Sequence, residues 1–365
     1  MQEKKNPRNP TPTGPSGVAA PPVPSFMPRP RMTARCGLTK LPSDVRTNHA
    51  HASQARRYRS SRSEWGPATK EKGMQFVGAY TALVTPFKNG GVDEERYREL
   101  IEWQIAEGID GLVPCGTTGE SATLSHEEHE RVISICIDQA KKRVPVIAGA
   151  GSNNTKEAIR LTQFAKEAGA DAALHITPYY NKPTQQGLFE HFKAIGEAVD
   201  MPLLVYNVPG RTSVNVAADT MGRIYKEIPN VIGAKEATGD MAHVSNMLEA
   251  CDEKFALLSG DDFTVLTTLA LGGCGVISVV SNLLPKKMAR LCAAFREGDL
   301  SEAKKLHYEM MPISRACFVE TNPIPVKTAL AKMGKMDIEM RLPLVPMAPE
   351  NERILEAAMR GLSLI

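Results

Sequence analysis

The sequence of 365 residues lacks several features that would define a function directly. Its seven cysteines are scattered, with no CxxC pair and no spacing typical of zinc ligands, so we expect neither disulfides nor a structural metal site. We expect buried thiols in a reducing compartment instead. No segment approaches the roughly 18 uninterrupted apolar residues of a membrane span. No G-x-G-x-x-G follows the first apolar segment, which argues against dinucleotide binding.

The net charge is small, but the charges are unevenly distributed along the chain. The formal net charge is +3, whereas residues 1–73 contain 14 Lys/Arg and only 4 Asp/Glu. The remainder contains 30 basic and 37 acidic residues. This larger part is mildly acidic, so its charge does not indicate a nucleic-acid partner.

Residues 1–73 differ from the rest in composition as well. They contain 11 of the 26 prolines and show neither helical nor strand periodicity, so we expect this segment to be disordered. An Arg/Ser-rich, acid-poor leader is typical of an organellar transit peptide, which would imply import into a plastid. We favour the alternative that Met74 is the initiator and the upstream residues are an extension, because Met74 immediately precedes the first predicted strand. In that case the protein is expected in the cytoplasm; the leader has no apolar core typical of secretion.

From Met74 onward, short apolar segments alternate with amphipathic ones. Amphipathic helices with apolar residues at 3–4 spacing are predicted between the strands, including 93–107, 126–141, 156–168 and 186–199. Ser125 and Glu128 predict a capping box, and Gly169 and Gly298 predict helix ends. Strands are predicted at 76–84, 111–114, 144–148, 172–177, 202–206, 231–235, 255–258 and 275–279.

Eight strands, each short and nearly all apolar, are expected where helices cover both faces of a parallel sheet. Eight strand–helix units favour an α/β fold of the TIM-barrel type, (β/α)8, over an open doubly wound sheet. We assign residues 74–299 to the barrel. Residues 300–365 are predicted to be a helical extension, with helices at 302–318, 325–332 and 350–360.

Barrel enzymes carry their catalytic groups at the C-terminal ends of the strands. The strand 231–235 ends in Lys235, and burial disfavours the charged form of an amine. A neutral lysine can attack a ketone and form an imine. The structural alternative is a lysine whose stem is buried while its ammonium reaches water.

Two neighbouring strands add groups suited to a keto acid. Tyr206 ends the strand 202–206 and can relay protons, while Arg211 follows it and can bind a carboxylate. Thr117 and Thr118 follow the strand 111–114 between two glycines, where backbone amides can approach a small anion. The alternatives are a structural tyrosine with a loop arginine, and a plain turn.

Tyr179 and Tyr180 follow the strand 172–177, where they could also simply pack. All four groups of residues lie at the same end of the predicted barrel, so one pocket can collect them. No serine–histidine–acid set stands out. The combination of an amine, phenols, hydroxyls and a guanidinium therefore predicts carbonyl chemistry through an imine.

Three segments resemble signatures of the dihydrodipicolinate synthase family. They are Gly116-Thr117-Thr118-Gly119-Glu120, Tyr206-Asn207-Val208-Pro209-Gly210-Arg211 and Gly233-Ala234-Lys235-Glu236-Ala237. The resemblance covers Met74–Ile365. The lysine strand is shared with the wider superfamily of pyruvate-dependent aldolases, whereas the paired threonines together with Arg211 are more specific.

The resemblance implies a role for each residue of the pocket. Lys235 would form an imine with pyruvate, and Thr117 and Thr118 would hold the pyruvate carboxylate. Thr118, Tyr206 and Tyr180 would form a proton relay, with Tyr180 reaching into the site of a neighbouring subunit.

The resemblance also implies the second substrate and the product. Arg211 would bind the carboxylate of L-aspartate 4-semialdehyde, the carbonyl of Ile277 would face the pocket, and Gly260 would line it. The product would be 4-hydroxy-tetrahydrodipicolinate, which leads to diaminopimelate and lysine. No metal or organic cofactor is expected, because the lysine imine serves as the electron sink. A homotetramer built from two tight dimers is implied.

A second, regulatory site is implied by the same resemblance. It would bind L-lysine as an inhibitor across a dimer interface, and the alternative is an ordinary polar helix surface. The matching positions are Ser121, Ala122, His126, His129, Asn153, Glu157 and Tyr179.

Two other functions stay open at this point. A different pyruvate-dependent lyase, such as an N-acetylneuraminate lyase or a keto-deoxy-sugar-acid aldolase, would keep Lys235 and Tyr206 but would not need Arg211. A non-catalytic barrel would be expected to have lost the lysine, a tyrosine or the threonines, and none of these is missing.

Overall fold

A computed structural model describes residues 76–365 of the chain. The expectations for residues 1–73, disorder and a transit peptide or an upstream extension, lie outside the described residues. None of the helices within 76–365 is long and apolar enough to cross a membrane.

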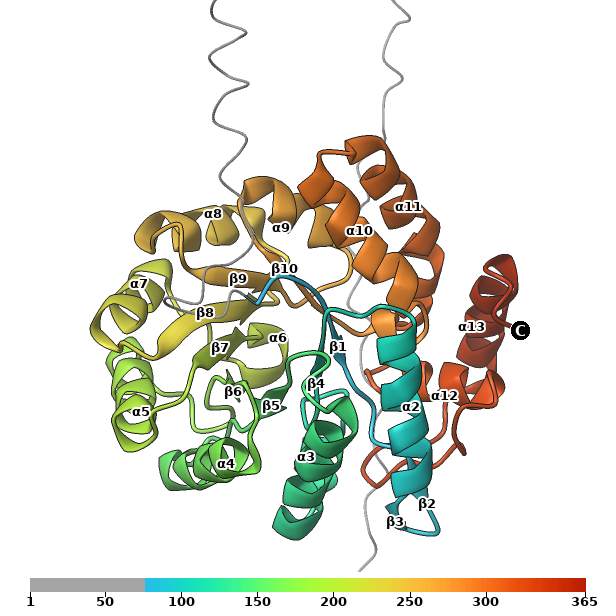
Figure 1. Ribbon diagram of the computed structural model, residues 1–365, viewed down its shortest axis with the longest axis horizontal. Coiled ribbons are helices and arrows are strands. Elements are labelled where there is room, and N and C mark those ends of the chain that lie inside the picture. Colours follow the sequence, from blue (N-terminus) through green and yellow to red (C-terminus); the bar gives the residue numbers. More distant parts are fainter. Residues whose placement is uncertain (1–75) are drawn as a thin grey trace, which may run out of the picture. The chain divides into compact units, whose positions relative to one another are not determined.

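Eight parallel strands form a ring at the centre of the described part (Figure 1). The first strand pairs with the last, and an isolated parallel bridge between Leu112 and Val146 links the two ends of the strand order. The predicted (β/α)8 barrel is therefore confirmed. In spatial order the strands are β4 (Gly111–Val113), β1 (Gly78–Ala82), β10 (Gly275–Ser278), β9 (Ala256–Ser259), β8 (Val231–Glu236), β7 (Leu203–Asn207), β6 (Ala172–Ile176) and β5 (Ile147–Gly149).

A ring of helices surrounds the strands. The capping box of Ser125 and Glu128 is present, and Gly169 and Gly298 end their helices with positive φ values of 93° and 82°. The helices are α2 (Glu94–Ala106), α3 (His126–Ala140), α4 (Thr155–Ala168), α5 (Gln185–Ala198), α7 (Ala218–Glu227), α8 (Met241–Ala250), α9 (Val265–Leu271) and α10 (Pro285–Glu297), with short turns α6 (Pro209–Thr212), η1 (Ser121–Thr123) and η2 (Val280–Asn282).

One pair of short strands was not predicted. Strands β2 (Phe87–Lys88) and β3 (Gly91–Val92) form an antiparallel hairpin between β1 and α2. Asn89 and Gly90 at its turn both have positive φ, 53° and 81°. Asn-Gly is a strong signal for such a turn, because both residues tolerate this backbone conformation.

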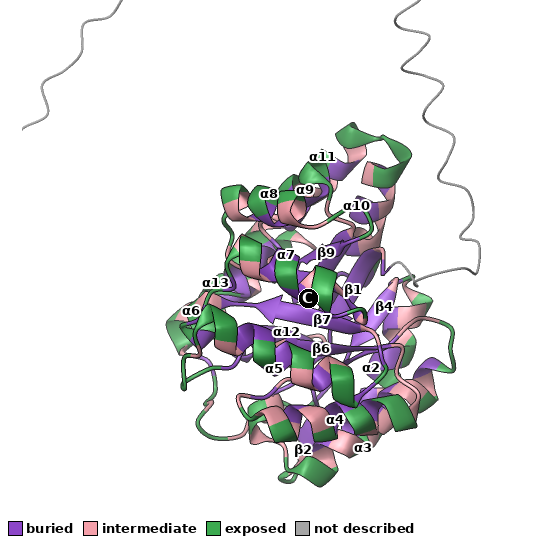
Figure 2. Ribbon diagram, turned by 90° about the vertical axis from the view of Figure 1, so that its left-hand side faces the viewer, coloured by how far each residue is buried: buried purple, intermediate pink, exposed green. Residues whose placement is uncertain are grey.

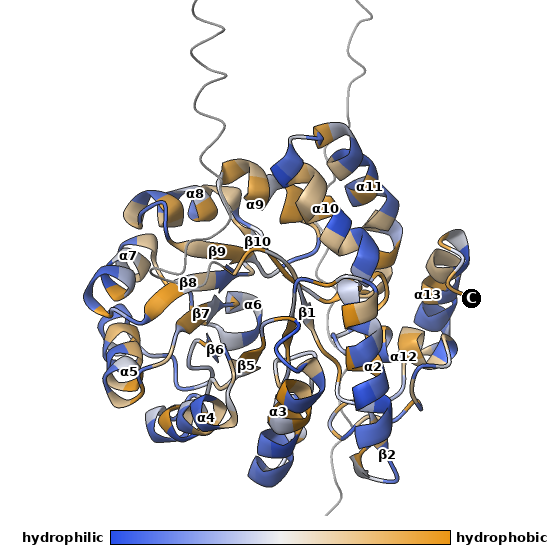
Figure 3. Ribbon diagram, in the orientation of Figure 1, coloured by the Kyte–Doolittle hydropathy of each residue, from blue (hydrophilic) through white to orange (hydrophobic). Residues whose placement is uncertain are grey.

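The apolar core consists of two layers. A small inner cluster includes alternate residues of single strands, such as Leu204 and Tyr206, and these side chains point into the barrel. A larger cluster fills the space between strands and helices. Figure 2 shows the strands buried and the outer helix faces exposed, and Figure 3 shows that the helices carry one apolar and one polar side.

The predicted C-terminal extension is confirmed as three helices, α11 (Leu300–Ala316), α12 (Ile324–Lys332) and α13 (Pro349–Gly361). Helix α11 packs against α10, and α13 packs against both α11 and α12. Six cysteines lie in the described part and are free. Cys251 and Cys274 are only half-buried, whereas the other four are buried as expected.

Candidate active site

Lys235 points into the barrel from strand β8. It lies in register with Tyr206 of β7 and Leu258 of β9, and both of these belong to the inner cluster. The Lys235 residue is 6% exposed, and its Nζ lies 4.2 Å from the centre of the Tyr206 ring. Within residues 76–365 it forms no ion pair. The strand therefore delivers a primary amine without a counter-charge to the inside of the barrel.

Gly260 follows β9 and lies directly beside this lysine. A Cβ at this position would lie 3.1 Å from Cε of Lys235 and 2.7 Å from Cβ of Ala237. The Gly260 N–H donates to the carbonyl of Glu236, which holds the two strand ends together at 2.6 Å. A side chain at position 260 would press on the lysine. That Gly260 lines a substrate pocket stays a prediction.

The loop after β4 carries the two threonines. Thr118 is 2% exposed and Thr117 is half-buried. Gly119 is packed so tightly that a Cβ would lie 3.0 Å from the carbonyl oxygen of Leu83. The Thr118 hydroxyl accepts a hydrogen bond of 3.0 Å from Nδ2 of Asn322.

Arg211 lies in the short turn α6 and is exposed. Its Nη2 donates to the carbonyl oxygen of Asn322 at 3.1 Å, and it forms no ion pair within the described residues. The guanidinium retains free donors for a ligand carboxylate. Asn322 thus contacts both Thr118 and Arg211, and brings the two predicted binding residues together.

The predicted proton relay is not assembled within one chain. Among residues 76–365, the hydroxyl of Thr118 has no hydrogen bond to Tyr206 or Tyr180; its partner is Asn322. Tyr180 is 90% exposed and has a positive φ of 70°. Its role in a neighbouring subunit stays a prediction. Ile277 belongs to the inner cluster and is 0% exposed, and the orientation of its carbonyl toward a ligand also stays a prediction.

The residues of the predicted L-lysine site are only partly brought together. His126 lies 3.2 Å from the Glu157 carboxylate, which also accepts from Ser152. Asn153 donates to the Tyr179 carbonyl at 3.0 Å. These groups form a polar patch where helices α3 and α4 begin.

The other predicted residues of this site differ in how far they are exposed to a ligand. His129 is buried, its Nε2 lies 2.7 Å from the Gly149 carbonyl, and burial lowers its pKa. That ring nitrogen already has a partner. Ser121 and Ala122 begin the turn η1 and are half-buried and exposed, respectively.

Three residues of the C-terminal extension that the sequence did not single out contribute to this region. Besides Asn322, Lys327 of α12 forms a fully buried ion pair with Glu120 at 2.5 Å. Arg341 makes two bonds of 2.6 Å to Glu128 of α3. These contacts join positions more than 200 apart in sequence, and no local pattern signals them.

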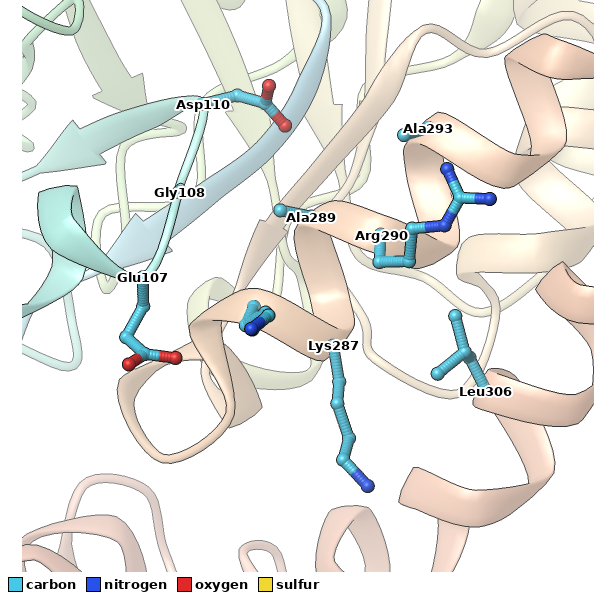
Figure 4. Close-up of a pocket in the computed structure, with 9 residues that line it drawn as sticks. Glu107, Gly108, Asp110, Lys287, Ala289, Arg290, Ala293 and Leu306 are labelled. Carbon is cyan, nitrogen blue, oxygen red and sulfur yellow. The ribbon is translucent and has the colours of Figure 1, made fainter.

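One hollow of the described surface lies at the other end of the barrel. It has a volume of about 510 Å³ (Figure 4). Glu107, Gly108 and Asp110, which precede strand β4, form one side of it. Helices α10 and α11 form the other side, with Lys287, Arg290 and Leu306. Lys235 lies near the C-terminal end of its strand, so this hollow is not where the predicted catalytic residues lie.

Comparison with known proteins gives a consistent result. The Dihydrodipicolinate synthetase family matches residues 75–361. The 4-hydroxy-tetrahydrodipicolinate synthase of Oleidesulfovibrio alaskensis is 64% identical over 292 residues, which is 80% of this chain and 100% of the relative.

Solved structures agree with this match. The dihydrodipicolinate synthase of Acinetobacter baumannii, complexed with pyruvate, is 48% identical with a TM-score of 0.78, covering 80% of this chain and 100% of that one. The enzyme of Cyanidioschyzon merolae with lysine bound is 39% identical with a TM-score of 0.78, at the same coverage. The chain belongs to the dihydrodipicolinate synthetase family.

Proposed function

We propose that this protein is the lyase that condenses pyruvate with L-aspartate 4-semialdehyde to give 4-hydroxy-tetrahydrodipicolinate, a step of lysine and diaminopimelate biosynthesis. The observation that carries the proposal is the environment of Lys235. Its amine is buried at the C-terminal end of a barrel strand, faces the ring of Tyr206 and has no ion-pair partner within the described residues.

The first half of the reaction forms the nucleophile. The Lys235 nitrogen attacks the keto carbon of pyruvate, and the resulting carbinolamine loses water once its hydroxyl is protonated. The Tyr206 ring lies beside the amine, and its phenol serves as this acid. Loss of a methyl proton then converts the imine into an enamine.

The second half joins the two substrates. The enamine carbon attacks the aldehyde carbon of the semialdehyde, and the new alkoxide takes up a proton. The amino group of the semialdehyde then attacks the imine carbon, closes the ring and releases Lys235. Neither a metal nor an organic cofactor takes part in this scheme, because the imine accepts the electron pair itself.

Binding of the two carboxylates is divided between two loops. Thr117 and Thr118 hold the carboxylate of pyruvate near Lys235. Arg211 holds the carboxylate of the semialdehyde, since its guanidinium is exposed and retains free donors. A pyruvate-dependent lyase acting on sugar acids would not need this arginine.

The catalytic unit is an assembly of subunits. Tyr180 is 90% exposed in a backbone conformation that few non-glycine residues adopt, and such a tyrosine is well suited to insert into a second copy. We assign the assembly as a tetramer of two dimers, in which Tyr180 completes the proton relay of its neighbour. The reaction takes place in the cytoplasm. It would take place in a plastid instead if residues 1–73 act as a transit peptide.

L-lysine inhibits the enzyme by binding to the polar patch of His126, Glu157, Asn153 and Tyr179. The patch offers a carboxylate for the ammonium groups of lysine and an amide for its carboxylate. Tyr179 adjoins Tyr180, so the patch is directly connected to the proposed relay. A titration of L-lysine into the turnover assay should lower the rate, and a constant rate would remove this regulatory assignment only.

Borohydride trapping tests the proposal. The protein is incubated with pyruvate and borohydride and digested, and the peptide containing residue 235 should gain the mass of reduced pyruvate. Coupled turnover should be observed with pyruvate and L-aspartate 4-semialdehyde, and not in the cleavage of sialic acid or keto-deoxy acids. An unlabelled peptide would reject the imine, and preferred turnover of a sugar acid would reject the substrate.

A further inference from the structure

A buried ion pair connects the C-terminal extension with the loop that carries Thr117 and Thr118. Nζ of Lys327 lies 2.5 Å from Oε1 of Glu120, and both side chains are 0% exposed. In the ion pairs formed elsewhere within residues 76–365, at least one side chain reaches solvent. Oε2 of the same carboxylate accepts a bond of 3.3 Å from the Arg341 N–H. Glu120 is therefore held from both of its oxygens by the extension.

The pair is a poor means of stabilising a fold. Transfer of each charge out of water costs several kcal/mol, and apolar residues of the same volume often serve stability as well or better. Burial lowers the pKa of Lys327, and the Glu120 carboxylate opposes that shift. The presence of this buried ion pair is better explained by the backbone geometry that it fixes than by stability.

The geometry in question is the backbone of the threonine loop. Glu120 has a positive φ of 53°, an unfavourable conformation for a residue with a long side chain. Its N–H donates to the Thr117 carbonyl at 3.1 Å, and the Gly119 N–H donates to the Gly116 carbonyl at 3.1 Å. A shift of the Glu120 side chain would therefore be transmitted to the backbone of both threonines.

The other end of the same segment reaches the pocket. Asn322, which comes just before α12, donates to Thr118 and accepts from Arg211. Asn322 is 5% exposed, and its side-chain oxygen has no partner among the described residues. Lys327 lies in the first turns of α12, and its own N–H donates to the Pro323 carbonyl at 3.0 Å. Helix α12 thus connects the Glu120 contact rigidly with the Thr118 and Arg211 contacts.

We propose that the buried Glu120–Lys327 ion pair positions the two substrate-binding elements, and that Lys327 is a positioning residue for the condensation. The proposal rests on the proposed function. Lys327 does not touch the substrate; it fixes the loop of Thr117 and Thr118 relative to Asn322 and Arg211. Small displacements of such groups can cost up to about 100-fold in rate.

The test is a double-mutant cycle with Glu120→Gln, Lys327→Met and the double variant. The double variant contains no buried charge, so its thermal unfolding should return close to that of the wild type. Its kcat/KM for both substrates should stay reduced by about 10-fold or more, because the ion pair that fixes the loop of Thr117 and Thr118 is absent. A double variant with restored unfolding and wild-type kcat/KM would overturn the proposal, since the pair would then be structural only.

Two further variants keep the test decisive if the double variant does not fold. Glu120→Asp keeps both charges but withdraws the carboxylate by one methylene; kcat/KM should fall about 10-fold while the protein unfolds cooperatively. A folded Glu120→Asp variant with unchanged kinetics would also overturn the proposal. Lys332→Met is the matched control, because Lys332 lies on the same helix and pairs with Glu352 and Glu356 of α13, away from the loop. It should leave kcat/KM within about 2-fold.

Borohydride trapping separates this proposal from the proposed function. If the wild-type protein forms no imine at Lys235, the proposed function fails, and the positioning role of Lys327 fails with it. If the wild type forms the imine and turns over, the proposal depends only on the variants. The rate of trapping should fall in the double variant, because the threonine loop holds pyruvate beside the amine.

Discussion

Strand β8 and helix α12 each bury a lysine, and the two lysines have different surroundings. Lys235 is 6% exposed and faces an aromatic ring, without an ion-pair partner in the described part of the chain. Lys327 is 0% exposed and contacts the Glu120 carboxylate. A buried ammonium needs a paired anion, and Glu120 supplies one for Lys327. Burial alone does not make a lysine a nucleophile; the absence of a carboxylate partner distinguishes Lys235, the proposed nucleophile.

Substitution of Lys235 should have the largest effect on turnover. Lys235→Ala removes the amine that is placed to form the imine and should lower kcat by more than about 1,000-fold. The comparison predicts little effect on stability, because no carboxylate is left unpaired. Kinetics and thermal unfolding of the same preparation measure both quantities. Turnover near the wild-type rate would contradict the role of Lys235.

Substitution of Lys327 should destabilise the protein far more than substitution of Lys235. Lys327→Met leaves the Glu120 carboxylate buried and unpaired, and this should lower the free energy of unfolding by about 3–5 kcal/mol. Lys235→Met, of the same shape, should change it by less than about 1 kcal/mol. Urea unfolding of the two variants side by side measures the difference. Equal losses would mean that the two surroundings do not differ as described.

Arg211 extends the comparison to an exposed cation. Arg211→Ala should reduce kcat/KM for L-aspartate 4-semialdehyde by about 10- to 100-fold, as expected for loss of a charged hydrogen bond. Imine formation with pyruvate alone should change far less. The two are measured by steady-state kinetics and by borohydride trapping. Equal impairment of both steps would contradict the assignment of Arg211 to the second carboxylate.

Local patterns were sufficient to predict the barrel and Lys235. Apolar strands, the capping box of Ser125 and helix ends such as Gly169 are encoded within a few residues. The ends of the eight strands meet on one face by topology alone, which predicted the position of Lys235 beside Tyr206.

The contacts of Glu120 and Asn322 could not be predicted in the same way. They depend on how the C-terminal extension returns to the loop after β4, and residues about 200 apart in sequence show no periodicity that connects them. Tyr180 is a further case. Its predicted partner belongs to another subunit, and one sequence does not encode the geometry of that contact locally.

A buried acid without a cation completes the comparison. Asp262 is 4% exposed and accepts from the Ser278 hydroxyl at 2.5 Å and from the N–H groups of Val279 and Val280 at 3.1 Å. Burial raises its pKa to about 6, although these hydrogen bonds oppose the shift. The native state therefore holds a proton on Asp262 that the unfolded chain has already released above about pH 4.

The sign of the pH dependence follows from this difference. Between about pH 4 and pH 6 the native state binds more protons at this site, so stability falls as pH rises through that window. A shift of about two pKa units corresponds to about 3 kcal/mol. Asp262→Asn removes the titration, so its stability relative to the wild type should increase by about 2–3 kcal/mol from pH 4 to pH 7. Urea midpoints across this range measure it.

Asp252 provides the matched control for this window. It is exposed, and a hydrogen bond from the Tyr225 hydroxyl lowers its pKa, so its contribution to stability is lost as pH falls. Asp252→Asn should therefore leave the profile between pH 4 and pH 7 unchanged, because this carboxyl titrates below that window. If Asp252→Asn shifted the profile in this window as Asp262→Asn does, burial would not be the cause of the raised pKa of Asp262. An aspartate buried without an opposite charge would then be no more sensitive to pH than an exposed one.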